Sequence, residues 1–198
     1  MMVLLALALA YLLGAIPFGY LLVKWGTGGD IRSAGSGNTG ATNVLRTTGR
    51  AAGVATLLLD IAKGYAAVWI AARLTGGDPL WMSAAALAVM AGHAYPVFLG
   101  FKGGKAVASF VGAFLYLTPW TIAVAGVVFA GMVIWTRTIS MASITGAAVF
   151  PLGTWLIEKA PAAVVAAAMI GGAFIIIRHK GNIQKLRMGT ENPFRFGN

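Results

Sequence analysis

The residues best suited to chemistry lie in a short polar segment, 33–43, which reads SAGSGNTGATN and separates two long apolar runs. Glycines let a backbone turn sharply and approach a ligand, and successive free N–H groups in such a turn bind anions. Ser, Thr and Asn side chains add hydrogen-bonding groups, and Arg46 follows closely. The segment therefore predicts a phosphate site at a membrane surface. Its candidate ligands are Ser36, Gly37, Asn38, Gly40, Thr42, Asn43 and Arg46.

Two further polar clusters contain both histidines of the protein, and the three clusters together, with the first counted over 32–46, contain most of its Lys and Arg residues. Residues 92–105 include His93 and end in Lys-Gly-Gly-Lys, a turn whose free N–H groups suit an anion at the start of a helix. Residues 178–192 include His179, Asn182 and Glu191. The candidate phosphate ligands of the two clusters are Lys102, Gly103, Gly104, Lys105 and Asn182. The candidate general bases are His93, His179 and Glu191.

Each cluster also has a purely structural interpretation. Residues 33–43 can be a flexible linker, the lysines of the second cluster can anchor a membrane surface, and Lys185 and Arg187 can contact anionic headgroups. His93 can be a hydrogen-bonded residue at the membrane interface, and His179 a solvated residue of the tail. Against the linker, such segments do not usually combine paired Asn and Thr with Arg.

Two well-known phosphate motifs are excluded. Residues 35–40 match G-x-G-x-x-G, but a dinucleotide site needs a preceding strand within a βαβ unit, and membrane spans flank this segment. The second cluster lacks a P-loop because Leu99 and Ala106 stand where that motif needs Gly and Ser or Thr. The histidines have no partners at metal-ligand spacing, so we expect no metal and no cofactor.

The elements that must position these clusters are transmembrane helices. Hydrophobic residues make up 59% of the 198 residues, charged residues only 10%, and mean hydropathy is +0.81. We expect an all-α polytopic bundle of about seven spans that forms a single domain over residues 1–198. The fourth span is the shortest and could be re-entrant with the fifth. The predicted spans are about 3–24, 51–72, 80–99, 104–118, 119–136, 140–157 and 160–177.

The net charge of +10 is distributed unevenly between alternate loops. Loops on one side carry most of the Lys and Arg residues, which marks that side as cytoplasmic. All three clusters are therefore expected in the cytoplasm and the N-terminus outside. The tryptophans lie near the predicted span ends, where amphipathic rings prefer to sit. A nucleic-acid partner is not expected, because the basic tail is short and lacks stacking aromatic residues.

Asp60 and Lys63 are the two ionisable residues within the second span, three apart on one helix face. Ionisable residues at membrane depth are usually paired or line a polar cavity. We expect a structural ion pair that borders the site.

Together the three clusters resemble the motifs of bacterial acyl-phosphate:glycerol-3-phosphate acyltransferases, in the same order and at similar spacing over nearly the whole chain. The resemblance implies a bacterial inner-membrane enzyme that moves a fatty acyl group from acyl phosphate to the 1-hydroxyl of sn-glycerol 3-phosphate. The products are 1-acylglycerol 3-phosphate and phosphate, in the first step of phospholipid synthesis. No obligate protein partner is expected.

The chemical properties of the candidate residues also suit this reaction, independently of the resemblance. Arg46 suits a bidentate phosphate contact, Lys105 a point charge, and Ser36, Asn43 and Asn182 the fixing of phosphate or glycerol oxygens. No G-x-S-x-G elbow is present, and the donor is already activated, so direct transfer is expected, with a substrate phosphate oxygen as an alternative base. The rival function is a small transporter for a phosphorylated metabolite, although such proteins usually place the site near the midplane and often contain repeats.

Overall fold

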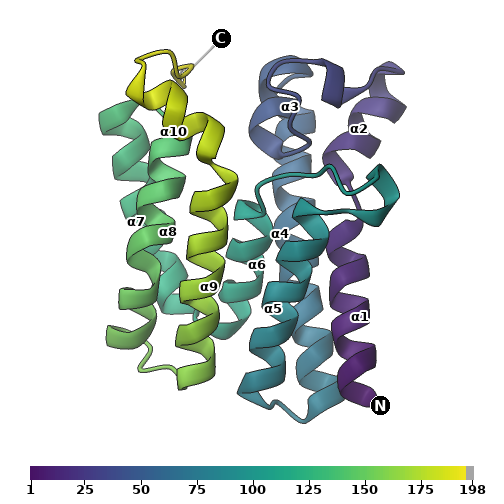
Figure 1. The fold of residues 1–198 in the computed structure, drawn as a ribbon, viewed down its shortest axis with the longest axis vertical. Coiled ribbons are helices and arrows are strands. Elements are labelled where there is room, and N and C mark those ends of the chain that lie inside the picture. The colour runs from purple at the N-terminus through teal and green to yellow at the C-terminus, as the bar shows by residue number, and fades with distance from the viewer. Residues whose placement is uncertain (195–198) are drawn as a thin grey trace. The chain divides into compact units, whose positions relative to one another are not determined.

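The computed structural model describes residues 1–194, which form helices and loops and contain no strand. The chain forms two compact units, Met1–Leu117 (unit 1) and Thr118–Asn198 (unit 2), and each is described by itself. In Figure 1, unit 1 runs from purple to teal and unit 2 from green to yellow. A single domain over residues 1–198 stays a prediction.

Unit 1 contains most of the loops with functional candidates. Its elements are α1 (Met2–Ala15), α2 (Phe18–Thr27), the 3₁₀ helix η1 (Ile31–Ser33), α3 (Ala41–Thr47), α4 (Arg50–Thr75), α5 (Pro79–Ala94), the 3₁₀ helix η2 (Val97–Leu99) and α6 (Val107–Leu117). Unit 2 consists of α7 (Pro119–Thr136), α8 (Ile139–Leu156), α9 (Ala162–Arg178) and α10 (Lys180–Arg187). Within it, α8 contacts both α7 and α9.

The prediction of an all-α polytopic membrane protein is confirmed. Five helical stretches of the described chain are long and apolar enough to span a membrane, and α9 with α10, bent by 57°, forms a sixth if the pair is one span. All seven predicted positions carry an apolar helix, but α6 has only 11 residues. That is about 16 Å of helix against roughly 30 Å of hydrocarbon. The count of seven is therefore approximate.

The first predicted span, 3–24, is not one continuous helix. The chain leaves the helical conformation at Ile16 and Pro17, between α1 and α2. Proline has no N–H to donate and its ring obstructs the preceding turn, so it interrupts the helix. The break leaves backbone carbonyls at membrane depth that need other partners.

Glycines let the helices of unit 1 approach closely, as the abundance of Ala and Gly predicts. A Cβ on Gly112 of α6 would overlap the carbonyl of Ile61 in α4, and a Cβ on Gly64 of α4 would overlap the carbonyl of Ser109 in α6. The α4–α6 contact therefore depends on two glycines, one on each helix.

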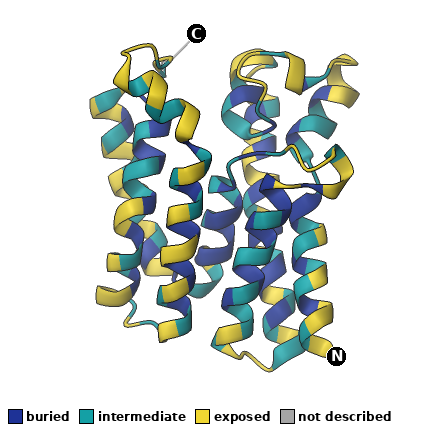
Figure 2. Ribbon diagram, in the orientation of Figure 1, coloured by how far each residue is buried: buried dark blue, intermediate teal, exposed yellow. Residues whose placement is uncertain are grey.

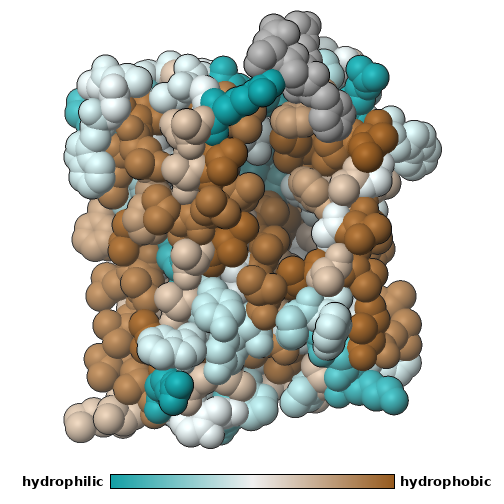
Figure 3. Space-filling model, turned by 180° about the vertical axis from the view of Figure 1, so that it is seen from behind, coloured by the Kyte–Doolittle hydropathy of each residue, from teal (hydrophilic) through white to brown (hydrophobic). Residues whose placement is uncertain are grey.

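The exposed surface is largely apolar, as a lipid environment requires. Buried residues face the neighbouring helices of each unit, and exposed residues lie on the outer sides and at the ends (Figure 2). Brown, apolar side chains cover most of the helices in Figure 3, whereas teal, hydrophilic ones gather near helix ends. Trp25, Trp120, Trp135 and Trp155 are 60–80% exposed near the ends of their helices. Their placement agrees with an interfacial belt of aromatic rings.

Candidate functional site

The first polar cluster forms a loop that folds around the amide of Asn43, in the first turn of α3. Asn43 is 4% exposed. Its Oδ1 accepts a hydrogen bond from the N–H of Ser36 at 2.9 Å. Its Nδ2 donates to the carbonyls of Ala34 at 3.0 Å and Asn38 at 2.9 Å, with a longer contact to Ile31 at 3.4 Å. The amide expected to contact substrate is thus already engaged in shaping the loop.

The backbone N–H groups of this loop are also largely engaged within it. The N–H of Gly37 donates to the carbonyl of Ala34 at 3.0 Å, and that of Gly40 to the Oδ1 of Asn38 at 2.8 Å. With the N–H of Ser36 held by Asn43, three of the loop's donors have partners inside the protein. The expectation that successive free N–H groups cradle an anion is therefore wrong at these three positions.

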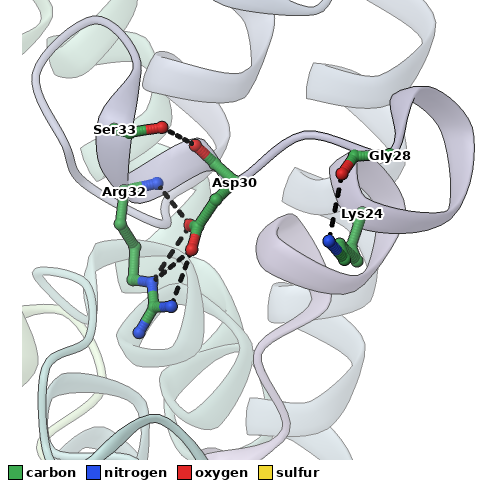
Figure 4. A network of polar contacts seen from close by, with 5 residues as sticks. All are labelled: Lys24, Gly28, Asp30, Arg32 and Ser33. Atoms are coloured by element: carbon green, nitrogen blue, oxygen red, sulfur yellow. Dashed lines mark hydrogen bonds and ion pairs between the residues drawn. The ribbon is translucent and has the colours of Figure 1, made fainter.

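The chain that enters the first cluster is fixed by its own polar contacts (Figure 4). The Nζ of Lys24 donates to the carbonyl of Gly28 at 3.0 Å, beyond the end of α2. The carboxylate of Asp30 accepts from the Arg32 guanidinium at 2.7 Å and from the Arg32 N–H at 2.9 Å. These hydrogen bonds from Arg32 lower the pKa of Asp30 to about 2. The turn therefore favours the charged form of the Asp30 carboxylate.

The second cluster folds back onto the end of α5. The N–H of Gly103 donates to the carbonyl of Ala94, and the N–H of Gly104 to that of His93, both at 3.1 Å. The free anion-binding N–H groups expected at these two glycines are instead paired with α5. A Cβ on Gly104 would overlap the Nε2 of His93, so the loop backbone lies directly against the imidazole. Close approach explains why glycine stands here.

His93 is 8% exposed and lies among other polar groups of unit 1. Its Nδ1 is 3.2 Å from the Oγ of Ser109 and 3.6 Å from the Oδ1 of Asp60. The predicted ion pair of Asp60 and Lys63 is confirmed, with 2.8 Å between Oδ1 and Nζ. All three of His93, Asp60 and Lys63 line a small pocket that also includes Thr39 of the first cluster. The pair thus borders the loops, as expected.

The third cluster lies in unit 2 and is organised by Glu191. The Oε1 of Glu191 accepts a hydrogen bond from the Nδ2 of Asn182 at 2.7 Å and another from the Oγ of Ser140 at 2.8 Å. His179 is 3% exposed at the corner between α9 and α10, and its Nδ1 lies 2.8 Å from the carbonyl of Ile175. The buried position of His179 contrasts with the solvated tail residue considered from the sequence.

The remaining candidates lie where a soluble ligand can reach them. Ser36, Arg46 and Lys102 are exposed, and Thr42 and Lys105 are half-buried. Arg46 is in the last turn of α3, where Asn43 anchors the preceding loop. Lys105 follows directly after the two glycines that hold the second loop to α5. In both clusters a loop held by hydrogen bonds is thus followed by a cationic side chain.

Sequence reasoning missed Ser109 and Ser140 as members of these clusters. Ser109 lies four residues after Lys105, within an otherwise apolar helix, and a polar residue at such a position is a usable signal. Ser140 is the second residue of α8 and 51 residues from Glu191 in sequence. Only the folded chain reveals that contact.

Comparison with known proteins identifies the family. The family model described as "Glycerol-3-phosphate acyltransferase" matches residues 4–189. A protein of that name from Geobacter sulfurreducens is 47% identical over 188 residues and covers 95% of each chain. A second, from Geobacter metallireducens, is 48% identical and covers 96% of this chain and 97% of its own.

Solved structures support the same family. Two crystal structures of PlsY (YgiH), described as an integral membrane glycerol 3-phosphate acyltransferase, are similar over 98% of this chain. The glycerol 3-phosphate form has a TM-score of 0.92 at 40% identity, and covers 96% of its own chain. The lysophosphatidic acid form has a TM-score of 0.90 at 39% identity, and covers 95% of its own. On its three polar clusters, its helical fold and these matches, the chain belongs to the glycerol-3-phosphate acyltransferase family.

Proposed function

We propose that this protein transfers a fatty acyl group from acyl phosphate to the 1-hydroxyl of glycerol 3-phosphate, and releases 1-acylglycerol 3-phosphate and inorganic phosphate. The observation that carries the proposal is the family match over residues 4–189, which spans all three clusters. The solved relatives, described as a glycerol 3-phosphate form and a lysophosphatidic acid form, correspond to the acceptor and the product.

Side chains, more than backbone amides, bind the phosphates in this proposal. The N–H groups of Ser36, Gly37, Gly40, Gly103 and Gly104 have acceptors within the protein. Arg46 and Lys105 then provide the principal positive charges, with Lys102 and the hydroxyls of Ser36 and Thr42 beside them. Charge-assisted contacts of this kind are shorter and stronger than neutral ones. Asn38, Asn43 and the glycines act by holding the loops in shape.

The reaction needs no acyl-enzyme. The 1-hydroxyl oxygen attacks the carbonyl carbon of the donor, the bond between that carbon and the phosphate oxygen breaks, and inorganic phosphate leaves. Arg46 and Lys105 stabilise the charge that develops on the carbonyl and phosphate oxygens. No cofactor or metal enters this scheme, and a single chain carries it out.

The proton of the attacking hydroxyl goes to a phosphate oxygen of the donor. Each candidate protein base has a structural engagement that favours a positioning role: His93 with Ser109, His179 with Ile175, and Glu191 with Asn182. A phosphate oxygen is adjacent to the reacting carbon in any productive alignment, so alignment alone brings base and nucleophile together.

The location proposed is the bacterial inner membrane, with the N-terminus outside and all three clusters in the cytoplasm. The uneven distribution of Lys and Arg among the loops supports this orientation. It places all three clusters on one face of the membrane.

The identity of the acyl donor can be tested by itself. Purified protein in detergent or lipid discs is given glycerol 3-phosphate with equal amounts of palmitoyl phosphate, palmitoyl-CoA or palmitoyl carrier protein. Only the acyl phosphate is expected to yield lysophosphatidate at a steady rate. Faster product formation from the thioesters would contradict the proposed donor and leave the family assignment intact.

A further inference from the structure

Four buried polar side chains of unit 1 form a connected cluster. Asp60 and Lys63 come from α4, His93 from α5 and Ser109 from α6. They are 2%, 4%, 8% and 0% exposed. Asp60 Oδ1 is 2.8 Å from Lys63 Nζ and 3.6 Å from His93 Nδ1, which is 3.2 Å from Ser109 Oγ. A buried ion pair is weak support for a purely stabilising role, because apolar replacements of similar volume often fold as well.

One side of this cluster supports the second loop. The carbonyl of His93 accepts the N–H of Gly104, and the adjacent carbonyl of Ala94 accepts that of Gly103. The imidazole of His93 lies against Gly104, with no room for a Cβ between them. His93, with Ser109 at hydrogen-bond distance and Asp60 at 3.6 Å, therefore supports the loop between Lys102 and Lys105.

The other side supports the chain that leads to the first loop. The Nζ of Lys63 donates to the carbonyl of Ile16 at 2.9 Å, in the break between α1 and α2, and lies 5.6 Å from the ring centre of Phe18. Gly19, the second residue of α2, packs directly against the first cluster, because a Cβ there would overlap the carbonyl of Thr39. Thr39, Asp60, Lys63 and His93 line the same pocket.

We propose that Asp60 and Lys63 are positioning residues that fix the two loops of unit 1 relative to each other. Asp60 orients His93, which contacts the second loop (102–105). Lys63 fixes the break between α1 and α2, and the chain continues from this break through α2 to the first loop (33–43). Neither residue contacts substrate. The kinetic consequence rests on the proposed acyltransferase function, whereas the order of the loop does not.

Loop order can be measured separately from activity because the chain has no cysteine. Phe98 is 62% exposed in η2, shortly before the second loop, so a spin label on Phe98→Cys reports the mobility of this segment. The label is placed in five backgrounds: unchanged, Asp60→Asn, Asp60→Glu, the double variant Asp60→Asn with Lys63→Met, and Ser83→Ala. Ser83 is a matched control, because it is buried in α5 with His93, and its hydroxyl has no hydrogen-bond partner among the described residues.

The double variant separates positioning from stability. Removing both charges leaves no unpaired buried ion, so its Tm is expected to return close to that of the unchanged protein. The label is nevertheless expected to gain a mobile component in Asp60→Asn and in the double variant, and KM for glycerol 3-phosphate to rise about tenfold in both. Ser83→Ala is expected to change neither quantity, and Asp60→Glu to recover part of the loss.

The opposite outcomes are equally definite. If the double variant recovers Tm, the label spectrum and KM together, the pair only balances charge and the inference is overturned. An unchanged spectrum in the folded Asp60→Asn variant overturns it as well. If no background makes lysophosphatidate but the label responds as described, the proposed function fails and the positioning role stands.

Discussion

Glu191 and Asn182 are joined by a hydrogen bond of 2.7 Å from the amide Nδ2 to the carboxylate Oε1. The same oxygen accepts the hydroxyl of Ser140 at 2.8 Å, so one carboxylate connects α8, α10 and the segment after α10. This arrangement uses Glu191 as an anchor for the Asn182 amide. It favours positioning over proton transfer as the role of Glu191.

Glu191→Gln tests that distinction, because Gln keeps an oxygen acceptor but cannot act as a base at neutral pH. We expect kcat to stay within about tenfold of the unchanged enzyme, and Glu191→Ala, which removes both hydrogen bonds, to lose more. Steady-state kinetics on folded proteins checks this. A loss of roughly 10³-fold or more in Glu191→Gln with normal folding would indicate general-base catalysis.

Arg46 is expected to bind substrate phosphate. Removing a charge-assisted contact costs about 1.5–3 kcal/mol, so kcat/KM of Arg46→Ala should fall roughly ten- to a hundredfold. Arg46→Lys should stay impaired, because an ammonium group lacks the planar fork of the guanidinium. Arg50, which is exposed at the start of α4, offers a control: Arg50→Lys should be near normal. Near-normal kinetics in well-folded Arg46→Ala would contradict the assignment.

We expect Ser36 to form a hydrogen bond with the substrate and not to act as a nucleophile. Protein is incubated with radiolabelled acyl phosphate alone and then denatured. No stoichiometric label should remain on the protein, and Ser36→Ala should slow the reaction without changing its course. Label that is retained on the protein, lost in Ser36→Ala and transferred to product by glycerol 3-phosphate would establish a covalent route.

Gly112→Ala is expected to destabilise unit 1, because its Cβ would overlap the backbone carbonyl of Ile61 and helices α4 and α6 must separate. Overpacking of this kind costs about 1–3 kcal/mol, which should appear as a lower Tm in detergent. Gly126→Ala in α7 is the matched control, because a Cβ there would meet no atom of the described residues within 4 Å outside the adjacent backbone of its own helix. Equal Tm values for the two variants would show that the α4–α6 contact tolerates a methyl group.

Single cysteines in this cysteine-free chain test the proposed orientation. Gln184 and Asp78 are both exposed, the first in α10 and the second just before α5. An impermeant thiol reagent applied to intact cells should label Asp78→Cys and spare Gln184→Cys. After the cells are broken open, both should react. Labelling of Gln184→Cys alone in intact cells would reverse the orientation.

The sequence predicts the helices well where composition alone decides. The expected spans 119–136 and 140–157 match Pro119–Thr136 and Ile139–Leu156 within a residue, because apolar runs define both helices and a proline at the first position marks the start of the first. It fails where tertiary contacts decide. Helix α6 begins only at Val107, since the preceding loop is held to α5, and helix α10 was not expected at all.

In the candidate site, too, some features follow from the sequence and others depend on tertiary contacts. Residue types identified the three clusters, and the Asp60–Lys63 pair follows from helical spacing. The state of the backbone N–H groups could not be predicted, because their acceptors are set by the fold. Gly104 donates to His93, 11 positions earlier in the sequence, and Ser36 donates to an amide of a helix that follows it. The glycine-rich loops are therefore present as polar loops, but several of their N–H donors are paired within the protein, and the location of the site stays a prediction.

The most direct test of the account is a complete mass balance on the purified protein. Acyl phosphate and glycerol 3-phosphate are supplied together and separately, and lysophosphatidate and inorganic phosphate are measured. We predict that the two products form in equal amounts, only when both substrates are present, and that Arg46→Ala with Lys105→Ala forms neither at a comparable rate. Phosphate release without glycerol 3-phosphate would indicate a hydrolase. Uptake of glycerol 3-phosphate into proteoliposomes without acylation would indicate a transporter, and either result would contradict the account.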